Sequence, residues 1–248
     1  MRVLNLFLVV IISGCATQPH EAYRQVEKVE LKQPEQLMKE GYQTLANRNT
    51  KQAIEKYFNK AIDLCNEKYN NKEKKVYASR SSTDALFYMM KATSEKQDAI
   101  TVDSTCAEVL YLKGYASLDL GNVEKAVEYI NKAIIMSPVN SKYLSELGHI
   151  YQQERDFDRA NEYFKKAEEN AKLYSPAEVK IQELSRAKRG IAYTYIELGK
   201  LDDAEVIYRD CLKLDSNDKA ALNELKYIEK IRNYERKIST SVFEKTGN

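Results

Sequence analysis

Few residues in this sequence of 248 could carry out catalysis or bind a metal. It has two histidines and four cysteines, with no Cys-x-x-Cys motif and no histidine pair at helical spacing, so a zinc site is not expected. Gly-x-Ser-x-Gly, P-loop and dinucleotide-binding glycine motifs are also missing. Acidic pairs such as Asp202-Asp203 and Glu168-Glu169 are typical of helix starts and solvated helix faces. The sequence therefore predicts a protein that is not an enzyme and that binds no metal or cofactor.

The composition restricts the fold and the partners. Hydrophobic residues make up 43% and charged residues 31%, which is enough for a packed core. Only 8 glycines and 4 prolines are present, whereas sandwich, barrel and Rossmann folds need these residues in their many turns. The balance of 39 basic and 37 acidic residues gives no reason to expect nucleic acid as a partner. The composition favours an all-α fold.

The N-terminus has the pattern of a secretory signal. Arg2 precedes an apolar run over residues 3–12, which is shorter than the about 20 residues that span a bilayer. The tetrapeptide Ile-Ser-Gly-Cys that ends at Cys15 resembles the bacterial lipobox, in which the cysteine becomes lipid-modified and N-terminal. This resemblance implies an acyl anchor at Cys15. The alternative is an ordinary signal peptide cut nearby, with Cys15 as a spare cysteine.

The resemblance also implies a location and a domain organisation. In enteric bacteria an Asp after the lipidated cysteine marks inner-membrane retention, so Ala16 implies the outer membrane, on its periplasmic face, although the choice between the two membranes stays open. The polar segment over residues 16–34, which contains Pro19 and Pro34, is expected to be a spacer. We therefore expect a signal peptide over residues 1–14, a tether over 15–33, a folded domain over 34–238 and a flexible tail over 239–248.

A period of 34 residues organises the remainder of the chain. It separates Gly114 from Gly148, and it also separates Ala126 from Ala160 and Ala133 from Ala167. Small residues allow two helix backbones to approach closely, and larger residues beside them fill the grooves. The pattern resembles the tetratricopeptide repeat (TPR), a helix-turn-helix unit that buries its apolar face by stacking on its neighbours. The resemblance implies an all-α, right-handed α-solenoid of about five such units, closed by a capping helix over residues 219–236.

Two units fit the pattern less well. The first carries Gly41, Ala53 and Ala61, but its alanines are eight residues apart instead of seven, so one of them should be out of register. The second, from about Glu73, lacks the glycine of the first helix and is interpreted as a degenerate helix pair. Ten extra residues precede the fifth unit, and we expect them to form an extended helix end and a short joint at Pro176.

Three cysteines lie within the repeats. Cys211 replaces a packing alanine and is expected to be a buried small residue. Cys65 ends one second helix, and Cys106 precedes a first helix two units further on. A disulfide between them is conceivable, but the spacing cannot decide it, and the sequence does not favour it.

The resemblance also implies a partner-binding groove, because the first helices of TPR units line the concave face of the solenoid. Tyr and Arg are frequent at interface hot spots, and Arg186 and Arg189 could hold a carboxylate. The alternative for the tyrosines is that they only replace Phe and Trp in packing. Position by position, the implied groove residues are Tyr77, Tyr111, Tyr115, His149, Gln152, Arg186, Arg189, Tyr193 and Tyr227.

The functional hypothesis is a non-catalytic lipoprotein scaffold that binds proteins or peptide segments in the periplasm and supports assembly or localisation of an envelope complex. The layout resembles type IV pilus pilotins, the lipoprotein of the outer-membrane barrel assembly machine, and adaptors of peptidoglycan hydrolases or proteases. No residue motif selects one of these. A regulatory subunit of an envelope enzyme and a homo-oligomer built by stacking of terminal units remain alternatives.

Overall fold

The computed structural model describes residues 33–69 and 73–246, with side chains up to residue 238. The expected signal peptide, the lipidation site Cys15 and almost all of the tether lie outside the described residues. Within these residues, none of the helices combines the length and the apolar character that a bilayer span requires. The structure therefore covers the folded domain.

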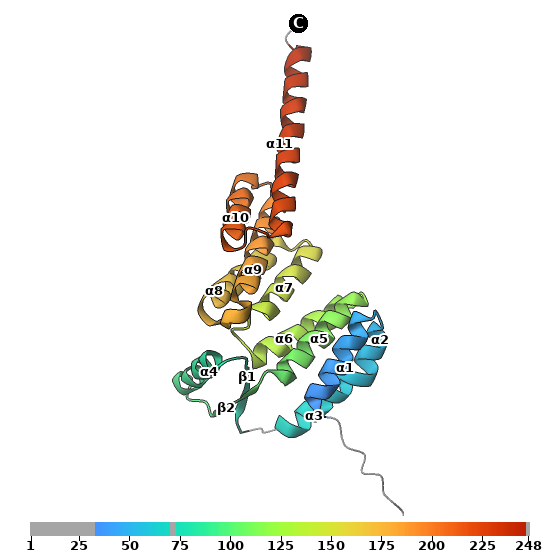
Figure 1. Cartoon of the computed structure of the whole chain (residues 1–248), viewed down its shortest axis with the longest axis vertical. Coiled ribbons are helices and arrows are strands. Elements are labelled where there is room, and N and C mark those ends of the chain that lie inside the picture. The colour runs from blue at the N-terminus through green and yellow to red at the C-terminus, as the bar shows by residue number, and fades with distance from the viewer. Residues whose placement is uncertain (1–32, 70–72, 247–248) are drawn as a thin grey trace, which may run out of the picture. The chain divides into compact units, whose positions relative to one another are not determined.

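Helix pairs stacked in chain order form most of this domain (Figure 1). The pairs are α1 with α2–α3, α5 with α6, α7 with α8, and α9 with α10, and α11 packs against α10 and α9. This confirms the all-α solenoid with a C-terminal capping helix. The elements are α1 (Pro34–Ala46), α2 (Thr50–Gln52), the π-helical η1 (Ala53–Phe58), α3 (Asn59–Tyr69), β1 (Lys75–Ser79), α4 (Ser82–Ser94), β2 (Ala99–Asp103), α5 (Thr105–Asp119), α6 (Val123–Met136), α7 (Ser141–Gln153), α8 (Phe157–Tyr174), α9 (Ala177–Glu197), α10 (Leu201–Leu214) and α11 (Lys219–Thr246).

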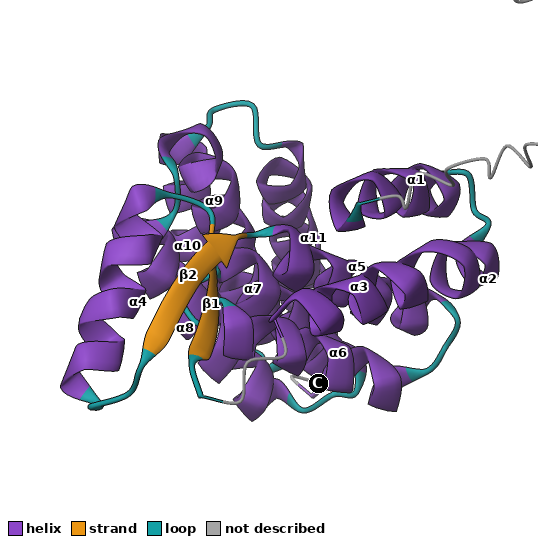
Figure 2. Ribbon diagram, turned by 90° about the horizontal axis from the view of Figure 1, so that it is seen from below, coloured by secondary structure: helices purple, strands orange, loops and turns teal. Residues whose placement is uncertain are grey.

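The expected degenerate second repeat is a strand–helix–strand insertion instead. Strands β1 and β2 pair in parallel, with Lys75 opposite Ala99, and α4 packs against both strands (Figure 2). Tyr77 of β1 and Tyr88 of α4 are fully buried, and their rings stack with centroids 5.0 Å apart. Both strands are rich in β-branched and aromatic residues, which favour a pleated conformation. The helix-pair prediction for this segment was wrong because it extended the 34-residue phase over a segment that keeps alanines at positions 92 and 99 but has Arg80 in place of the repeat's glycine.

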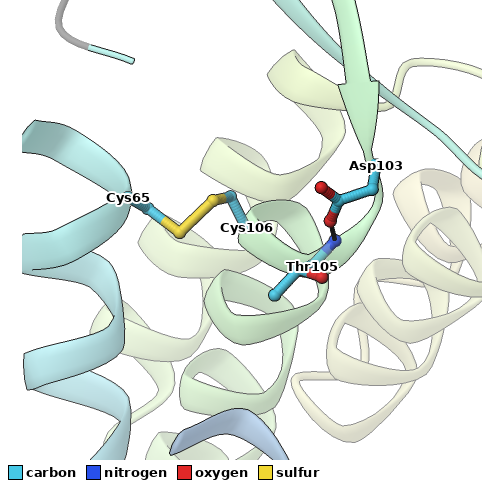
Figure 3. The surroundings of a disulfide bond; sticks show 4 residues. All are labelled: Cys65, Asp103, Thr105 and Cys106. Atoms are coloured by element: carbon cyan, nitrogen blue, oxygen red, sulfur yellow. Dashed lines mark hydrogen bonds between the residues drawn. A yellow bond between two sulfur atoms is a disulfide. The ribbon is translucent and has the colours of Figure 1, made fainter. Parts of the chain in front are cut away.

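The sequence did not favour a disulfide between Cys65 and Cys106, and the insertion explains why that prediction was wrong. Because the insertion replaces a repeat, α5 packs directly against α1 and α3. Cys65 at the end of α3 then lies beside Cys106 at the start of α5, and the two form a disulfide with their Cα atoms 5.8 Å apart (Figure 3). Next to it, Oδ1 of Asp103 accepts a hydrogen bond from the backbone N–H of Thr105 at 2.9 Å and so helps to start α5.

A π-helical turn corrects the register of the first unit. Ala53 and Ala61 are both fully buried, although their spacing of eight residues predicted that one would be out of register. The segment η1 between them is π-helical, and a π-helical turn holds one residue more than an α-helical turn. The extra residue is absorbed there, so both alanines face the core.

Helices α7 and α9 both approach the ring of Phe164 in α8 closely. A Cβ atom at Gly148 of α7 would lie 2.9 Å from the Phe164 ring, and a Cβ at Gly190 of α9 would lie 2.3 Å from it. Real Cβ atoms do not come this close to other atoms. The ring is therefore held between first helices of successive units, and it is 2% exposed.

The helices on either side of the joint between α8 and α9 are longer than in an ideal repeat. Helix α8 ends at Tyr174 and α9 begins at Ala177, so the extra residues lengthen both helices around Ser175 and Pro176, as the sequence predicted. Helix α11 continues to Thr246. Residue 238, where the folded domain was expected to end, is therefore not the end of a helix.

Candidate functional site

Two hollows on the first helices collect most of the predicted groove residues. The α7–α9 hollow, of about 340 Å³, includes His149 and Gln152 of α7 and Arg186, Arg189 and Tyr193 of α9. The α1–α5 hollow, of about 510 Å³, includes Tyr111 and Tyr115 of α5 together with Tyr42 of α1. Side chains three and four residues apart share one face of a helix, which is why these positions gather there.

Arg186, which lines the α7–α9 hollow, forms an ion pair with a buried carboxylate. Glu146 of α7 is 2% exposed, and its Oε2 lies 2.5 Å from Nη2 of Arg186. The hydroxyl of Tyr111 donates a hydrogen bond to the same oxygen at 3.3 Å. Burial, and then the charge of Glu146, raise the pKa of Tyr111 far above its ordinary value, so this hydroxyl stays protonated. The network ties α5, α7 and α9 together below the hollow.

Arg189 is paired in a similar way. Its Nη1 forms an ion pair with the carboxylate of Asp218, whose Oδ1 accepts a hydrogen bond from the backbone N–H of Ala221 at 3.1 Å in the first turn of α11. Both arginines still line the hollow. Because a guanidinium has five N–H donors, each could contact a partner only with the donors that these intramolecular bonds leave over. Arg186 and Arg189 are thus structural as well as potential binding residues.

The other polar side chains of the α7–α9 hollow differ in their hydrogen bonding. Nε2 of Gln152 donates to the carbonyl of Gly190 and to Oγ1 of Thr194, both at 2.8 Å. Burial raises the pKa of Glu224, which reaches this hollow from α11. Ser145 is fully buried at its edge, and its hydroxyl has no hydrogen-bond partner among the described residues.

The α1–α5 hollow is lined by aromatic rings and charges of both signs. Nζ of Lys142 lies 2.5 Å from Oε1 of Glu108 and 4.2 Å from the centroid of the Tyr111 ring. Tyr42 and Tyr115 are 58% and 44% exposed, so their rings are available to a partner. Such rings, with a polar hydroxyl at the tip, are well suited to protein interfaces.

Two predicted residues lie outside the hollows. Tyr77 is fully buried in the β1–α4–β2 insertion, so its assignment to the groove was wrong. Tyr227 of α11 is 51% exposed but lines neither hollow. His149 is exposed, and its Nε2 lies 3.1 Å from Nε2 of Gln153.

The sequence reasoning missed Glu146, Asp218 and Glu224. Glu146 left a usable signal, because it occupies the repeat position that holds the buried Leu112 in the preceding unit, 34 residues earlier. A charged residue at an apolar position of a repeat indicates a buried ion pair or a site. Asp218 and Glu224 gave no comparable signal, because helix starts and helix surfaces commonly carry acidic residues.

Comparison with protein families supports the repeat assignment. The tetratricopeptide repeat pattern matches residues 107–140, 141–172 and 190–218. These ranges cover the pairs α5–α6 and α7–α8, and then the last part of α9 with α10. No curated protein is similar enough to the chain to count as a relative.

Several solved structures are similar to the chain. PilF of Pseudomonas aeruginosa is 16% identical, with a TM-score of 0.57 over 81% of this chain and 70% of that protein. MamA is 19% identical, with a TM-score of 0.49 over 79% of this chain and 85% of its own. The first TPR domain of Spaghetti (RPAP3), solved with an HSP90 peptide, is 24% identical, with a TM-score of 0.45 over 53% of this chain and 97% of its own. At these identities PilF supports the fold alone. The chain is therefore a helical solenoid that contains three tetratricopeptide repeats.

Proposed function

We propose that this chain is a non-catalytic scaffold, anchored to the outer membrane through a lipid on Cys15, that binds protein partners in the periplasm and supports the assembly or localisation of an envelope complex. The observation that carries the binding part is the pair of hollows on successive first helices, with exposed tyrosines in both. The location depends on the signal sequence and the lipobox-like tetrapeptide.

The hollows suit an extended or helical segment of a protein. Each has a volume of several hundred Å³, and both are open to solvent and formed by helices of successive units. Tyr115 and Tyr193 are 44% and 41% exposed, and aromatic residues of this kind contribute much of the binding energy at interfaces. The N–H donors that the ion pairs of Arg186 and Arg189 leave over suit an acidic side chain or a terminal carboxylate of the partner at the α7–α9 hollow.

The disulfide supports an extracytoplasmic location. Disulfides such as Cys65–Cys106 form and persist in oxidising compartments, of which the bacterial periplasm is one. This agrees with the apolar run at residues 3–12 and with the small residues before Cys15.

Replacement of Tyr115 and Tyr193 by alanine tests the binding part. We expect the double variant to recover at most about a tenth of the partner that the wild type recovers, because each lost ring removes about 1–2 kcal/mol. The matched control is Ile135→Ala with Val206→Ala, because both residues are about 60% exposed but line neither hollow. Equal recovery by both variants, with unchanged thermal stability, would show that the first-helix face is not the binding surface.

Replacement of Cys15 by serine tests the anchor separately. The wild-type protein should fractionate with the outer membrane and carry acyl chains by mass spectrometry, whereas Cys15→Ser should carry no acyl chains and should not reach the outer-membrane fraction. If the wild type carries no lipid, the anchoring proposal fails while the binding proposal can still hold.

A further inference from the structure

The capping helix α11 has more apolar surface than its packing against the solenoid uses. One face of the helix, with Ala221, Leu225 and Ile228, packs against α10 and α9. Arg232 adds ion pairs with Asp202 and Glu205 of α10. Beyond this region the C-terminal half of α11 extends past the rest of the solenoid (Figure 1).

A second apolar face lies on the extending part of α11. We call it the α11 seam and define it by Tyr227, Ile231, Tyr234 and Ile238. Tyr227, Tyr234 and Ile238 are 51%, 67% and 46% exposed, and Ile231 is partly exposed. At about 100° per residue, the seam lies roughly 120° around the helix from the face that packs on α10. The helix therefore presents two separate apolar faces.

The spacing of the seam is that of a coiled coil. Its residues follow one another at intervals of four, three and four, which places the isoleucines at heptad a positions and the tyrosines at d positions. The preceding a position holds Glu224, which ends the pattern on that side. The seam is about 18 Å long. A helix surface that normally faces water has polar residues at such positions, so this face indicates a partner helix.

We propose that two copies of this chain associate through the α11 seam as a parallel two-stranded coiled coil. Isoleucine at a positions is typical of two-stranded parallel coiled coils, in which the d positions commonly hold leucine, whereas the d positions of the seam hold Tyr227 and Tyr234. The helix is already fixed by its packing on α10, so association does not have to nucleate it. A short seam can therefore suffice for a dimer that depends on concentration.

The charges beside the seam determine the orientation. Lys230 occupies a g position and Glu235 the following e position, both side chains are exposed, and neither forms an ion pair within the described part of the chain. In a parallel dimer, Lys230 of one copy lies beside Glu235 of the other, and this attractive pair occurs twice. In an antiparallel dimer, e positions meet e positions and g positions meet g positions, so like charges would face each other. The charge pattern therefore favours a parallel pair of identical chains.

Charge reversal in the full chain tests the proposal. By sedimentation equilibrium in detergent solution, we expect a reversible monomer–dimer equilibrium for the wild type. Lys230→Glu and Glu235→Lys should each weaken dimerisation by about tenfold or more, because each replaces two attractive pairs by two repulsive ones. The double variant K230E/E235K should restore the dimer. A wild type that stays monomeric at the highest concentration, or a double variant as weak as the single ones, would overturn the proposal.

Cysteine crosslinking tests the parallel register independently. In a parallel in-register dimer, equivalent d positions face each other, so Tyr234→Cys should give a disulfide-linked dimer on oxidation. Glu229→Cys, at an outward-facing f position, is the matched control, and the wild type reports any crosslinking through its own cysteines. Equal crosslinking at residues 229 and 234, or none at 234, would contradict the parallel seam.

Discussion

Substitution of Gly190 by alanine would test the packing between repeats. The added Cβ would lie 2.3, 2.4 and 2.5 Å from three atoms of the Phe164 ring. The ring cannot retreat freely, because it is 2% exposed and Gly148 approaches it from the other helix. The ring or the α9 backbone must therefore shift by about 1 Å, which is overpacking that typically costs about 1–3 kcal/mol.

The net effect should still be destabilising. Alanine gains about 1 kcal/mol over glycine in helix propensity, which offsets part of the strain. Because the contact is very short, we expect the strain to reach or exceed the top of its usual range, with a net loss of about 2 kcal/mol. For a domain of this size the melting temperature should fall by about 4–8 °C, which thermal unfolding followed by circular dichroism can measure.

A double-mutant cycle identifies the cause. In a Phe164→Leu background the clash is reduced, so Gly190→Ala should cost less there than in the wild type, with a coupling of about 1 kcal/mol or more. Gly121→Ala is the matched control, because Gly121 has a φ of +76° and no atom lies within 4 Å of the place that a Cβ would occupy. Its cost should be the same in both backgrounds. A Gly190→Ala protein as stable as the wild type, or a cost unchanged by Phe164→Leu, would refute this reasoning.

Three further predictions concern stability. Reduction of the Cys65–Cys106 disulfide, or Cys106→Ala, should lower the free energy of unfolding by about 4 kcal/mol, which is the chain-entropy value for a sequence separation of 41. Thermal melts with and without reductant measure this loss, and identical melts would show that the disulfide does not form. Burial raises the pKa values of Tyr88, Tyr111, Tyr143 and Tyr208, so the folded state keeps protons that the unfolded chain releases at about pH 10. The stabilisation from these four protonated hydroxyls is complete below that pH and is lost as the pH rises above it. Ultraviolet titration should show these tyrosines ionising together with unfolding, and independent ionisation at about pH 10 in the folded protein would contradict the prediction. Arg155 has a φ of +58° at the turn position that holds Gly121 one unit earlier. Arg155→Gly should therefore raise the free energy of unfolding by up to about 1 kcal/mol in denaturant titrations, and a lower stability would argue against backbone strain at Arg155.

The sequence predicted the parts of the fold that repeat. Small residues at fixed spacing, such as Gly114 and Gly148, determine where helices approach, and this local pattern is readable without a structure. The extended helix end and the short joint at Pro176 could be predicted because the added residues kept their helical character. The π-helical turn between Ala53 and Ala61 could not be predicted from spacing alone, because either alanine could have left the core.

The parts that do not repeat required the structure. The β1–α4–β2 insertion could not be predicted by extending the period, because two short strands are stabilised by their pairing and by α4 rather than by a local pattern. The disulfide depended on that insertion, since only the removal of a helix pair brings α3 and α5 together. Seven of the nine predicted groove residues line the two hollows, but the ion-pair partners of Arg186 and Arg189 are residues distant in the chain.

Site-specific photocrosslinking tests the central claim, that a protein partner binds on the first-helix face. A photoreactive residue would replace Tyr115 or Tyr193 in the full chain in cells, with Ile135 and Val206 as the control positions on second helices. We predict adducts to the same partner protein from positions 115 and 193, and none from 135 and 206. Adducts that form equally at the control positions, or only there, would contradict the claim.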